Sequence, residues 1–462
     1  METVLLIDIG STYTKAAIID LERLSIVRRS QSLTTINNNI LIGLKKVLLK
    51  LEGWEKAHYK LACSSAAGGL KIVAIGLVPE LTAEAVRRAA LGAGSRILKT
   101  YCYELTAEDI MEISQLKADI ILLAGGTDGG NKEVILQNAH KLAKEEIKCP
   151  IIIAGNRAVE ANVKNILTKA GKVSYITENV MPELEELNIE PARNKIREIF
   201  LNTIVQAKGL NKVKEFIDGI IMPTPAAVLK SASLLAQGYK DNPGLGELIV
   251  VDIGGATTDV HSVAQGEPVD TKIKWRGLEE PFIKRTVEGD IGMRFNAPSL
   301  MKIIGEESIK NQVYKLTGNH INSSELKNYL SKIHKQVNYL PISKNEKIIE
   351  KILAKNATQI ASARHVGNVK KFYTPMGSSY IQEGKDLRNI KTVIGTGGII
   401  AYSEKPELIM QGVLYKNQNS TQLLSPINPN ILLDRKYIMA LAGLLANVEP
   451  LKSLQLLKKY VN

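Results

Sequence analysis

Cysteine is scarce in this sequence of 462 residues. Only Cys63, Cys102 and Cys149 occur, and they are odd in number, far apart in the chain and without a CxxC pair. Such a set provides no framework for disulfide bonds or for a structural zinc site. We therefore expect a protein of the reducing cytoplasm.

Long apolar runs are also missing. No apolar stretch approaches the roughly 20 residues that a membrane-spanning helix needs. At the start of the chain, acidic Glu2 follows Met1 and the first apolar run ends at Asp8, which is unlike a signal peptide. We expect a cytoplasmic protein without a membrane partner.

Aromatic and acidic residues are few. Aromatic residues make up 5% of the chain, and 47 Asp and Glu stand against 60 Lys and Arg, which gives a formal net charge of +13. A basic chain admits a nucleic-acid partner, but the spacings typical of RRM, KH and zinc-finger modules are absent. The excess lysine is diffuse, so a solvated helical surface explains it best. A docking face for an acidic protein comes second and nucleic acid third.

The pattern of apolar residues predicts an α/β fold. Three strands open the chain, followed by a helix that ends at Gly53 and by a fourth strand. From about 67 to 210 helices alternate with strands, which implies a small and largely parallel sheet. Residues 296–371 are predicted to be mostly helical, and the chain ends in two helices separated by a break at Pro450.

Two short segments nearly repeat each other. DIGSTYTK (8–15) and DIGGATTD (252–259) each follow a short apolar run. An Asp at the end of a buried strand must point toward water, a cation or hydrogen-bond donors. The glycines permit tight turns in which backbone N–H groups can approach a phosphate. One such motif is weak evidence, but two placed alike predict a nucleotide clamp.

The side chains of both repeats suit a polyphosphate with its metal ion. Hydroxyl groups come from Ser11, Thr12, Thr14, Thr257 and Thr258. Mg²⁺ keeps several waters and uses few carboxylates, and the aspartates that could hold it are Asp8, Asp252 and Asp259. Lys15 offers one positive charge, and both a phosphate contact and a plain exposed strand position stay open for it.

The motifs resemble those of the actin, Hsp70 and sugar-kinase ATPase superfamily, and they occur in the same order. The first repeat is similar to its first phosphate motif and the second repeat to its second. IIMPTPAAVL (220–229) resembles the helix that links the lobes, and VIGTGGII (393–400) resembles the adenosine motif. The resemblance implies two ribonuclease-H-like lobes that bind ATP.

Finer details resemble one family, the MutL or GlmL accessory proteins of adenosylcobalamin-dependent glutamate mutase. The segments that carry this resemblance are LLAGGTDGGN (122–131), MPTPAAVL (222–229), DIGGATTDVHS (252–262) and EGDIGMR (288–294). It implies an actin-like ATPase that acts as a chaperone or reactivating factor, with mutase subunits as partners and ATP and Mg²⁺ as cofactors.

The resemblance also implies a role for each motif residue. Asp8 would order Mg²⁺ waters, Asp252 would orient or deprotonate the attacking water, and Asp259 would be a weaker magnesium contact. The residues that would hold the phosphates are Gly10, Ser11, Thr12, Tyr13, Gly254, Gly255, Ala256 and Thr257, and those beside the nucleoside are Gly395, Gly397 and Gly398. One departure is Met222, which stands where Hsp70-like proteins have a carboxylate. The expected consequence is slow hydrolysis.

The same resemblance divides the chain into lobes. We expect lobe I over 1–243 with an inserted α/β unit at about 67–210. Lobe II would cover 244–424 with a helical insertion at about 296–371, and the helices of 425–462 would return to lobe I.

Some motif residues have two open interpretations. The glycine-rich run around Asp128 is either a second ligand site or a tight turn in which Asn131 caps a helix. Asp290 is either close to the nucleotide or the N-cap of a helix. His261 and Cys63 are expected in the core rather than in proton transfer or nucleophilic attack.

Three functions fit these observations. The leading one is an ATP-driven switch that reactivates a mutase. A small-molecule kinase would need a carboxylate base aimed at its acceptor, and none stands out in the linking segment. The third is a nucleotide-dependent assembly protein of the actin type.

Overall fold

The computed structural model describes residues 2–35, 40–65, 70–200, 202, 216–269, 273–374, 377–414 and 422–462. The chain forms two compact units. The first consists of Met1–Gly68, Lys212–Arg276 and Glu280–Asn462, and the second of Gly69–Asn211 with Gly277–Glu279.

The first sheet of the larger unit begins with a three-stranded meander. Its strands, in the order β10-β4-β1-β2-β3, are β10 (Gly219–Pro223), β4 (Tyr59–Ser64), β1 (Thr3–Ile9), β2 (Tyr13–Asp20) and β3 (Ser25–Leu33). β1, β2 and β3 pair antiparallel, whereas β4 and β10 run parallel to β1. Helix α1 (Ile40–Leu48) packs on β2 and β3, and a short 3-10 turn (Trp54–Lys56) precedes β4.

The second sheet repeats this arrangement. Its order is β16-β14-β13-β19-β21, with strands β16 (Ile283–Glu288), β14 (Thr258–Val263), β13 (Leu248–Ile253), β19 (Thr392–Thr396) and β21 (Asn430–Leu433). As in the first sheet, three strands that follow one another in the chain, β13, β14 and β16, pair antiparallel. The other two strands, β19 and β21, run parallel to the central strand β13. The predicted α/β fold with two ribonuclease-H-like lobes is therefore confirmed.

Three helices fill the core that the two sheets share. They are α8 (Thr224–Gln237), α15 (Met439–Leu445) and α16 (Pro450–Tyr460), and a hairpin of β11 (Gly238–Tyr239) and β12 (Asn242–Pro243) follows α8. One apolar cluster joins residues of β1, β13 and all three helices. α15 packs against the first sheet and α8 against the second, and these two helices pack against each other. A Cβ atom on Gly443 would lie 1.9 Å from the carbonyl oxygen of Ala227, so only glycine fits at this contact.

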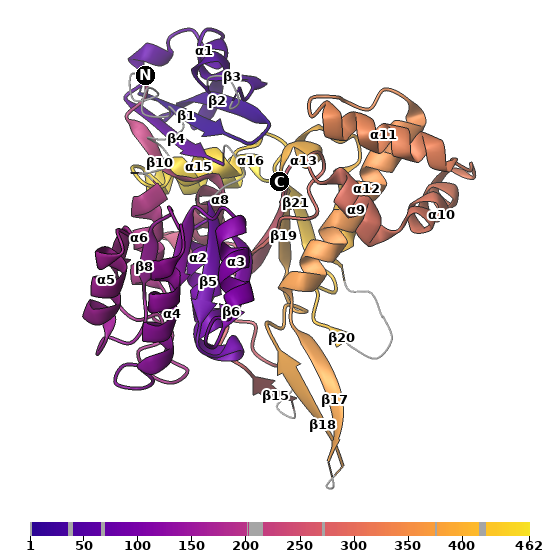
Figure 1. Cartoon of the computed structure of the whole chain (residues 1–462). Coiled ribbons are helices and arrows are strands. Elements are labelled where there is room, and N and C mark those ends of the chain that lie inside the picture. Colours follow the sequence, from indigo (N-terminus) through magenta and orange to yellow (C-terminus); the bar gives the residue numbers. More distant parts are fainter. Residues whose placement is uncertain are drawn as a thin grey trace. The chain divides into compact units, whose positions relative to one another are not determined.

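A helical segment covers the other face of the second sheet. It comprises α9 (Ala297–Ile304), α10 (Glu306–Thr317), α11 (Ser323–Lys335) and α12 (Lys344–His365). α12 starts at a capping box, in which Ser343 and Glu346 satisfy each other's backbone N–H groups, and packs on β13, β14 and β16. Figure 1 shows α12 running beside that sheet in orange.

Short elements complete this unit. A four-stranded sheet has the order β15-β18-β17-β20, with β15 (Ile273–Arg276), β18 (Gly377–Glu383), β17 (Asn368–Thr374) and β20 (Gln422–Leu423). Helices α13 (Gly398–Tyr402) and α14 (Pro406–Met410) and a 3-10 turn (Gln411–Val413) follow β19.

The second unit is a parallel α/β domain. Its five strands, in the order β6-β5-β7-β8-β9, are β6 (Arg96–Cys102), β5 (Lys71–Gly76), β7 (Ile120–Leu123), β8 (Ile151–Ile153) and β9 (Ser174–Ile176), and all pair parallel. A single π-helical turn (Pro79–Ala83) leads into its first helix. The helices are α2 (Glu84–Gly92), α3 (Ala107–Gln115), α4 (Glu133–Lys144), α5 (Glu160–Lys169) and α6 (Glu190–Ile199).

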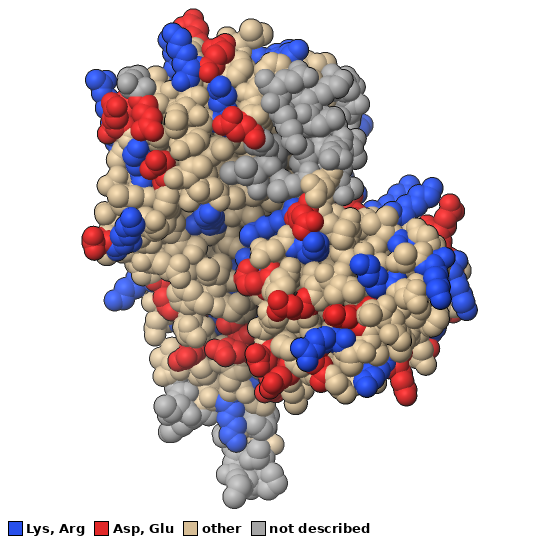
Figure 2. Space-filling model, turned by 90° about the vertical axis from the view of Figure 1, so that its left-hand side faces the viewer, with Lys and Arg blue, Asp and Glu red and all other residues tan. Residues whose placement is uncertain are grey.

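Charged side chains of both signs are mixed on one face of the protein. On the face drawn in Figure 2, Lys and Arg side chains stand singly or in small groups among Asp and Glu side chains. Within the described ranges, every helix is too short or too polar to cross a lipid bilayer.

Candidate functional site

Each repeated segment forms the turn of a β-hairpin at the end of a central strand. In the first hairpin the N–H group of Gly10 donates to the carbonyl oxygen of Tyr13 at 3.0 Å. In the second, Gly254 donates to Thr257 in the same way at 2.9 Å. A Cβ atom on either glycine would lie within 3 Å of that carbonyl oxygen, so both turns require glycine.

The two hairpin turns meet. A Cβ atom on Gly255 would be 2.8 Å from the hydroxyl oxygen of Thr12. Both turns line one cavity of about 490 Å³. The predicted residues that line it are Gly10, Ser11, Thr12, Tyr13, Lys15, Asp252, Gly254, Gly255, Ala256, Thr257, Asp259, Gly397 and Gly398. Segments about 240 residues apart in the sequence thus build a single site.

Asp8 lies behind the wall of this cavity and has no exposed surface. Its Oδ1 atom accepts a hydrogen bond from the hydroxyl group of Thr224 at 2.6 Å and lies 3.6 Å from the thiol of Cys63. Its Oδ2 atom accepts from the hydroxyl group of Tyr437 at 3.3 Å. Cys63 belongs to the core, as expected, and burial raises the pKa of its thiol well above the usual value.

Lys15 is opposite Asp8 in the register of the first hairpin and lines the cavity. Its Nζ atom lies 3.2 Å from the centre of the Tyr437 ring, a cation–π contact. Burial lowers the pKa of Lys15, although Asp8, Asp252 and Asp434 act in the opposite direction. The exposed strand position that the sequence left open is therefore excluded.

Asp252 lines the cavity, as does Asp259. Burial, reinforced by the neighbouring charge of Asp259, raises its pKa to about 7. A carboxylate in this range is suited to take a proton from water near neutral pH.

The carboxylate of Asp259 is held by neighbouring residues of the protein. Its Oδ1 atom accepts hydrogen bonds from Nε of Arg285 at 2.9 Å and from Nη2 at 2.5 Å, and its Oδ2 atom accepts from Thr257 at 2.8 Å. Both members of the ion pair are buried, with 2% of Arg285 and 7% of Asp259 exposed at the side chain. Both carboxylate oxygens are therefore engaged within the protein, and Asp259 supports the second hairpin. Its weaker magnesium contact stays a prediction.

Replacement of Arg285 with Ala is expected to destabilise the protein by about 3 kcal/mol, because it leaves the buried carboxylate of Asp259 without its cation. Denaturant unfolding of both proteins measures this difference. The matched control is Arg28→Ala, which breaks an exposed pair with Glu52 and should cost below about 1 kcal/mol. Equal losses in both variants would contradict a structural role of the buried pair.

The nucleoside motif lies beside the second hairpin. Gly397 has a φ of +103°, and a Cβ atom there would be 2.3 Å from the carbonyl oxygen of Ile253. Gly395 does not line the cavity, because it lies within β19 with its Cα facing Met410. Of the three glycines expected beside the nucleoside, Gly397 and Gly398 line the cavity, and their contact with a nucleoside stays a prediction. The cavity is also lined by Val337, Leu340, Pro341, Lys347, Lys351, Ile399, Tyr402, Ser403 and Glu404.

Among the residues that sequence reasoning missed are Thr224, Tyr437 and Asp434. Thr224 and Tyr437 both contact Asp8, and Asp434 accepts hydrogen bonds from the hydroxyl group of Thr396 and from two backbone N–H groups at the start of α15. Thr224 belongs to the recognised MPTP segment, so that motif could have indicated it. Nothing in the sequence near Tyr437 indicates a site.

Met222 provides no carboxylate to the site. It lies in β10, is partly buried and packs against the apolar core that the two sheets share. Thr224, two residues later, is the polar group that reaches Asp8.

The glycine-rich run of the second unit follows β7. Asp128 accepts hydrogen bonds from the N–H group of Arg157 and from the side-chain amide of Asn179. The side chain of Asn131 accepts from the N–H group of Val134 at the start of α4. These bonds favour the interpretation as a tight turn with a helix cap.

Two other candidates lie away from the cavity. Asp290 pairs with Arg364, while Asn296 precedes α9, so Asp290 is not the N-cap of that helix. His261 is fully buried in β14, and burial, followed by the charge of Arg285, lowers its pKa well below the usual value. A neutral core histidine agrees with the expectation.

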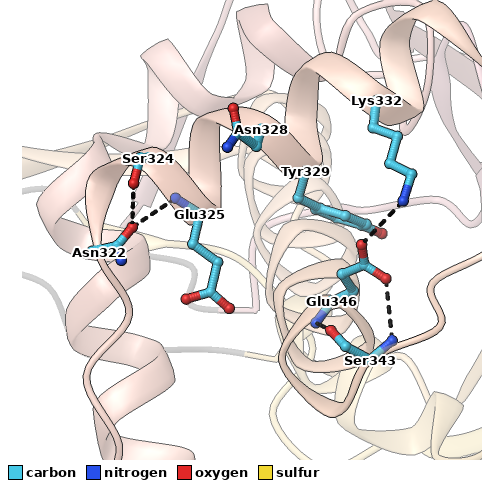
Figure 3. Close-up of a pocket in the computed structure, with 8 residues that line it drawn as sticks. All are labelled: Asn322, Ser324, Glu325, Asn328, Tyr329, Lys332, Ser343 and Glu346. Carbon is cyan, nitrogen blue, oxygen red and sulfur yellow. Dashed lines mark hydrogen bonds and ion pairs between the residues drawn. The ribbon is translucent and has the colours of Figure 1, made fainter.

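A second cavity, of about 480 Å³, lies between α11 and the start of α12 (Figure 3). Several of its polar side chains pair with one another. Asn322 bonds to Ser324 and to the backbone of Glu325, and Glu346 interacts with Lys332 and Ser343. This cavity therefore offers few free polar groups to a ligand.

The donor set of the first cavity fits a magnesium ion held with a nucleotide. Among the described residues, no group of three or more His, Cys, Asp or Glu could hold a metal ion alone. Mg²⁺, however, commonly uses one or two carboxylates together with waters and phosphates. Asp252 at the cavity and Asp8 behind it suit that mode, and the buried hydroxyl oxygen of Thr12 has no hydrogen-bond partner among the described residues.

The doubled sheet and its facing hairpins define an actin-like α/β protein. The profile of the family described as MutL protein matches residues 4–461. Protein MutL of Clostridium tetanomorphum is 50% identical over 466 residues, which cover 100% of this chain and 99% of that protein. The chain therefore belongs to the MutL protein family, as the sequence motifs predict.

Solved structures show only distant likeness. The activator of the 2-hydroxyisocaproyl-CoA dehydratase from Clostridium difficile, with bound ADPNP, is 11% identical, with 100% of this chain and 98% of that chain covered and a TM-score of 0.32. Plasmodium falciparum glycerol kinase with ADP is 11% identical, with 100% and 93% covered and a TM-score of 0.36. Similarity at this level carries no argument about function.

Proposed function

We propose that this protein binds ATP with Mg²⁺, hydrolyses it slowly and serves as a reactivating factor for an adenosylcobalamin-dependent mutase of the glutamate mutase type. The observation that carries the ATP part is the meeting of the two glycine hairpins, where the Cα of Gly255 faces the hydroxyl group of Thr12 across one cavity. The mutase part rests on membership of the MutL family and on the resemblance of its motifs.

The phosphates would lie between the two turns. Backbone N–H groups of 10–13 and 254–257 are the expected donors, since small residues there let the backbone approach closely. Lys15 would add positive charge, and a bound magnesium ion offsets the remaining charge of the phosphates. The nucleoside would extend toward Gly397 and Gly398.

Asp252 would orient the attacking water and accept its proton. Its raised pKa of about 7 places a base of suitable strength at the phosphate end of the cavity. No second acid comes from β10, because Met222 packs into the core. Slow turnover follows from that lack, and slow turnover is suited to a switch that holds one nucleotide state long enough for a partner to recognise it.

Reactivation is tested with a mutase that has been inactivated by damage to its cobalamin. Adding this protein and ATP is expected to restore turnover at least several-fold, because exchange of damaged cofactor requires an ATP-driven change in the partner. The controls are ADP in place of ATP and the Asp252→Asn variant.

Unchanged activity of an intact mutase, with complex formation demonstrated, would rule out the reactivating role. ADP formation that depends on a small acceptor molecule would instead indicate a kinase. Sedimentation of large particles only with ATP would indicate an assembly protein.

A further inference from the structure

Tyr437 stands between the cavity and Asp8. Asp8 is completely buried, whereas Tyr437, Thr224 and Lys15 line the cavity in front of it. The hydroxyl group of Tyr437 donates to Oδ2 of Asp8, while Thr224 and Cys63 contact Oδ1. A hydrated ion that enters the cavity therefore meets Tyr437 before it can reach the carboxylate.

The Tyr437 ring also contacts the ammonium group of Lys15, the lysine of the first hairpin. Nζ of Lys15 lies 3.2 Å from the ring centre, and the ammonium group interacts with Asp8, Asp252 and Asp434. One tyrosine thus contacts both the carboxylate and the lysine of the first motif.

The backbone of Tyr437 is in an uncommon conformation. Its φ is +52°, in the left-handed region that residues with a Cβ atom rarely adopt. Such a conformation persists where surrounding contacts hold it, and it is concentrated at functional sites. The contacts here are those of the side chain with Asp8 and Lys15 and those of Asp434, which bonds to the first N–H groups of α15 and to Thr396.

We propose that Tyr437 is a positioning residue that controls the access of a magnesium–nucleotide complex to Asp8, an inference that rests on the function proposed above. In the free protein Tyr437 and Lys15 cover the carboxylate. When the complex binds, the Tyr437 hydroxyl group gives up its bond to Asp8, and Lys15 leaves the ring to contact the phosphates.

The first test compares the wild type with Tyr437→Phe, which removes the hydroxyl group and keeps the ring. Binding of ATP is measured by calorimetry over a range of Mg²⁺ concentrations and again in EDTA. The Mg²⁺ concentration for half-saturation is expected to fall about fivefold, the equivalent of one typical hydrogen bond that no longer competes for Asp8. ATP affinity in EDTA is expected to stay within about twofold of the wild type.

Tyr339→Phe is the matched control. The Tyr339 hydroxyl group also bonds to a carboxylate, that of Glu346, and Lys332 lies 3.9 Å from the centre of its ring, but Tyr339 does not line the cavity. This variant should leave the Mg²⁺ dependence unchanged. An unchanged or increased Mg²⁺ requirement in Tyr437→Phe would overturn the proposal, whereas a wild type without Mg²⁺-dependent ATP binding would overturn the proposed function as well.

A second measurement follows Lys15 directly, without nucleotide. Acetic anhydride is expected to acetylate Lys15 at least threefold faster in Tyr437→Leu than in the wild type, because the ring that covers the ammonium group is gone. Tyr437→Phe should retain the wild-type rate, since it keeps the ring. Equal rates in all three proteins, as determined by mass spectrometry, would contradict the covering role of Tyr437.

Discussion

Replacement of Asp252 with Asn is expected to lower the rate of ATP hydrolysis by about 10³-fold, the scale typical of a general base. Asn has the same shape but cannot accept a proton from water. The affinity for ATP with Mg²⁺ should change much less, because the backbone of both hairpins still lines the cavity. Single-turnover hydrolysis and calorimetry together separate these two effects.

The pH profile adds a further test of Asp252. Burial and Asp259 raise its pKa to about 7, so a large part of the free protein carries the inactive, protonated acid at neutral pH. The ratio kcat/KM should therefore rise as the pH increases through about 7 and level off above it. In Asp252→Asn this rise should be absent.

A carboxylate outside the cavity provides the control for this substitution. Asp290 is 43% exposed at the side chain and pairs with Arg364, and Asp290→Asn should leave hydrolysis within about twofold of the wild type. Undiminished hydrolysis in Asp252→Asn would remove this residue from the mechanism.

Replacement of Gly443 with Val is expected to destabilise the protein by about 3 kcal/mol or more, the upper range for overpacking a core. The added Cβ atom would lie 1.9 Å from the carbonyl oxygen of Ala227, and backbone atoms cannot turn aside as a flexible side chain can. The helices α8 and α15 would have to separate, which opens the apolar cluster that both sheets share. Denaturant unfolding of the nucleotide-free protein measures the loss.

Gly398→Ala serves as the control for stability. No atom lies within 4 Å of a Cβ placed there, and its φ is not in the left-handed region. Its unfolding free energy should match the wild type within about 0.5 kcal/mol. A Gly443→Val protein as stable as this control would show that the two helices can move apart without cost.

Much of the fold could be predicted from local patterns. The segment around Pro223 and Pro225, which resembles the helix that links the lobes, forms the end of β10 and the start of α8, because proline tolerates a strand end and a first helical turn. Likewise Pro450 starts α16, where the sequence predicted a break. The predicted end of helix α1 at Gly53 is wrong, because the helix ends at Leu48. Gly53, which has a φ of +85°, belongs to the turn that follows.

Contacts between distant residues could not be predicted in this way. The hairpin turns were recognisable because Asp and Gly follow a buried strand within a few residues. Tyr437 lies 429 residues from Asp8 in the sequence. No local sequence pattern indicates that the segment before α15 contacts the first motif. The ion pair of Asp259 with Arg285 depends on the pairing of β14 with β16 and is equally invisible before the sheet is known.

The parallel pairing of β4 with β10 limits how this chain can be shortened. The second unit is inserted in the crossover that carries the chain from the end of β4 back to the start of β10. Those two points lie at opposite ends of two neighbouring parallel strands, so a direct junction of Ser64 to Gly219 would prevent β10 from pairing in its present direction. A deletion that leaves a dozen or more residues, enough for one returning helix, would retain the strand order of the sheet and the position of Thr224 beside Asp8.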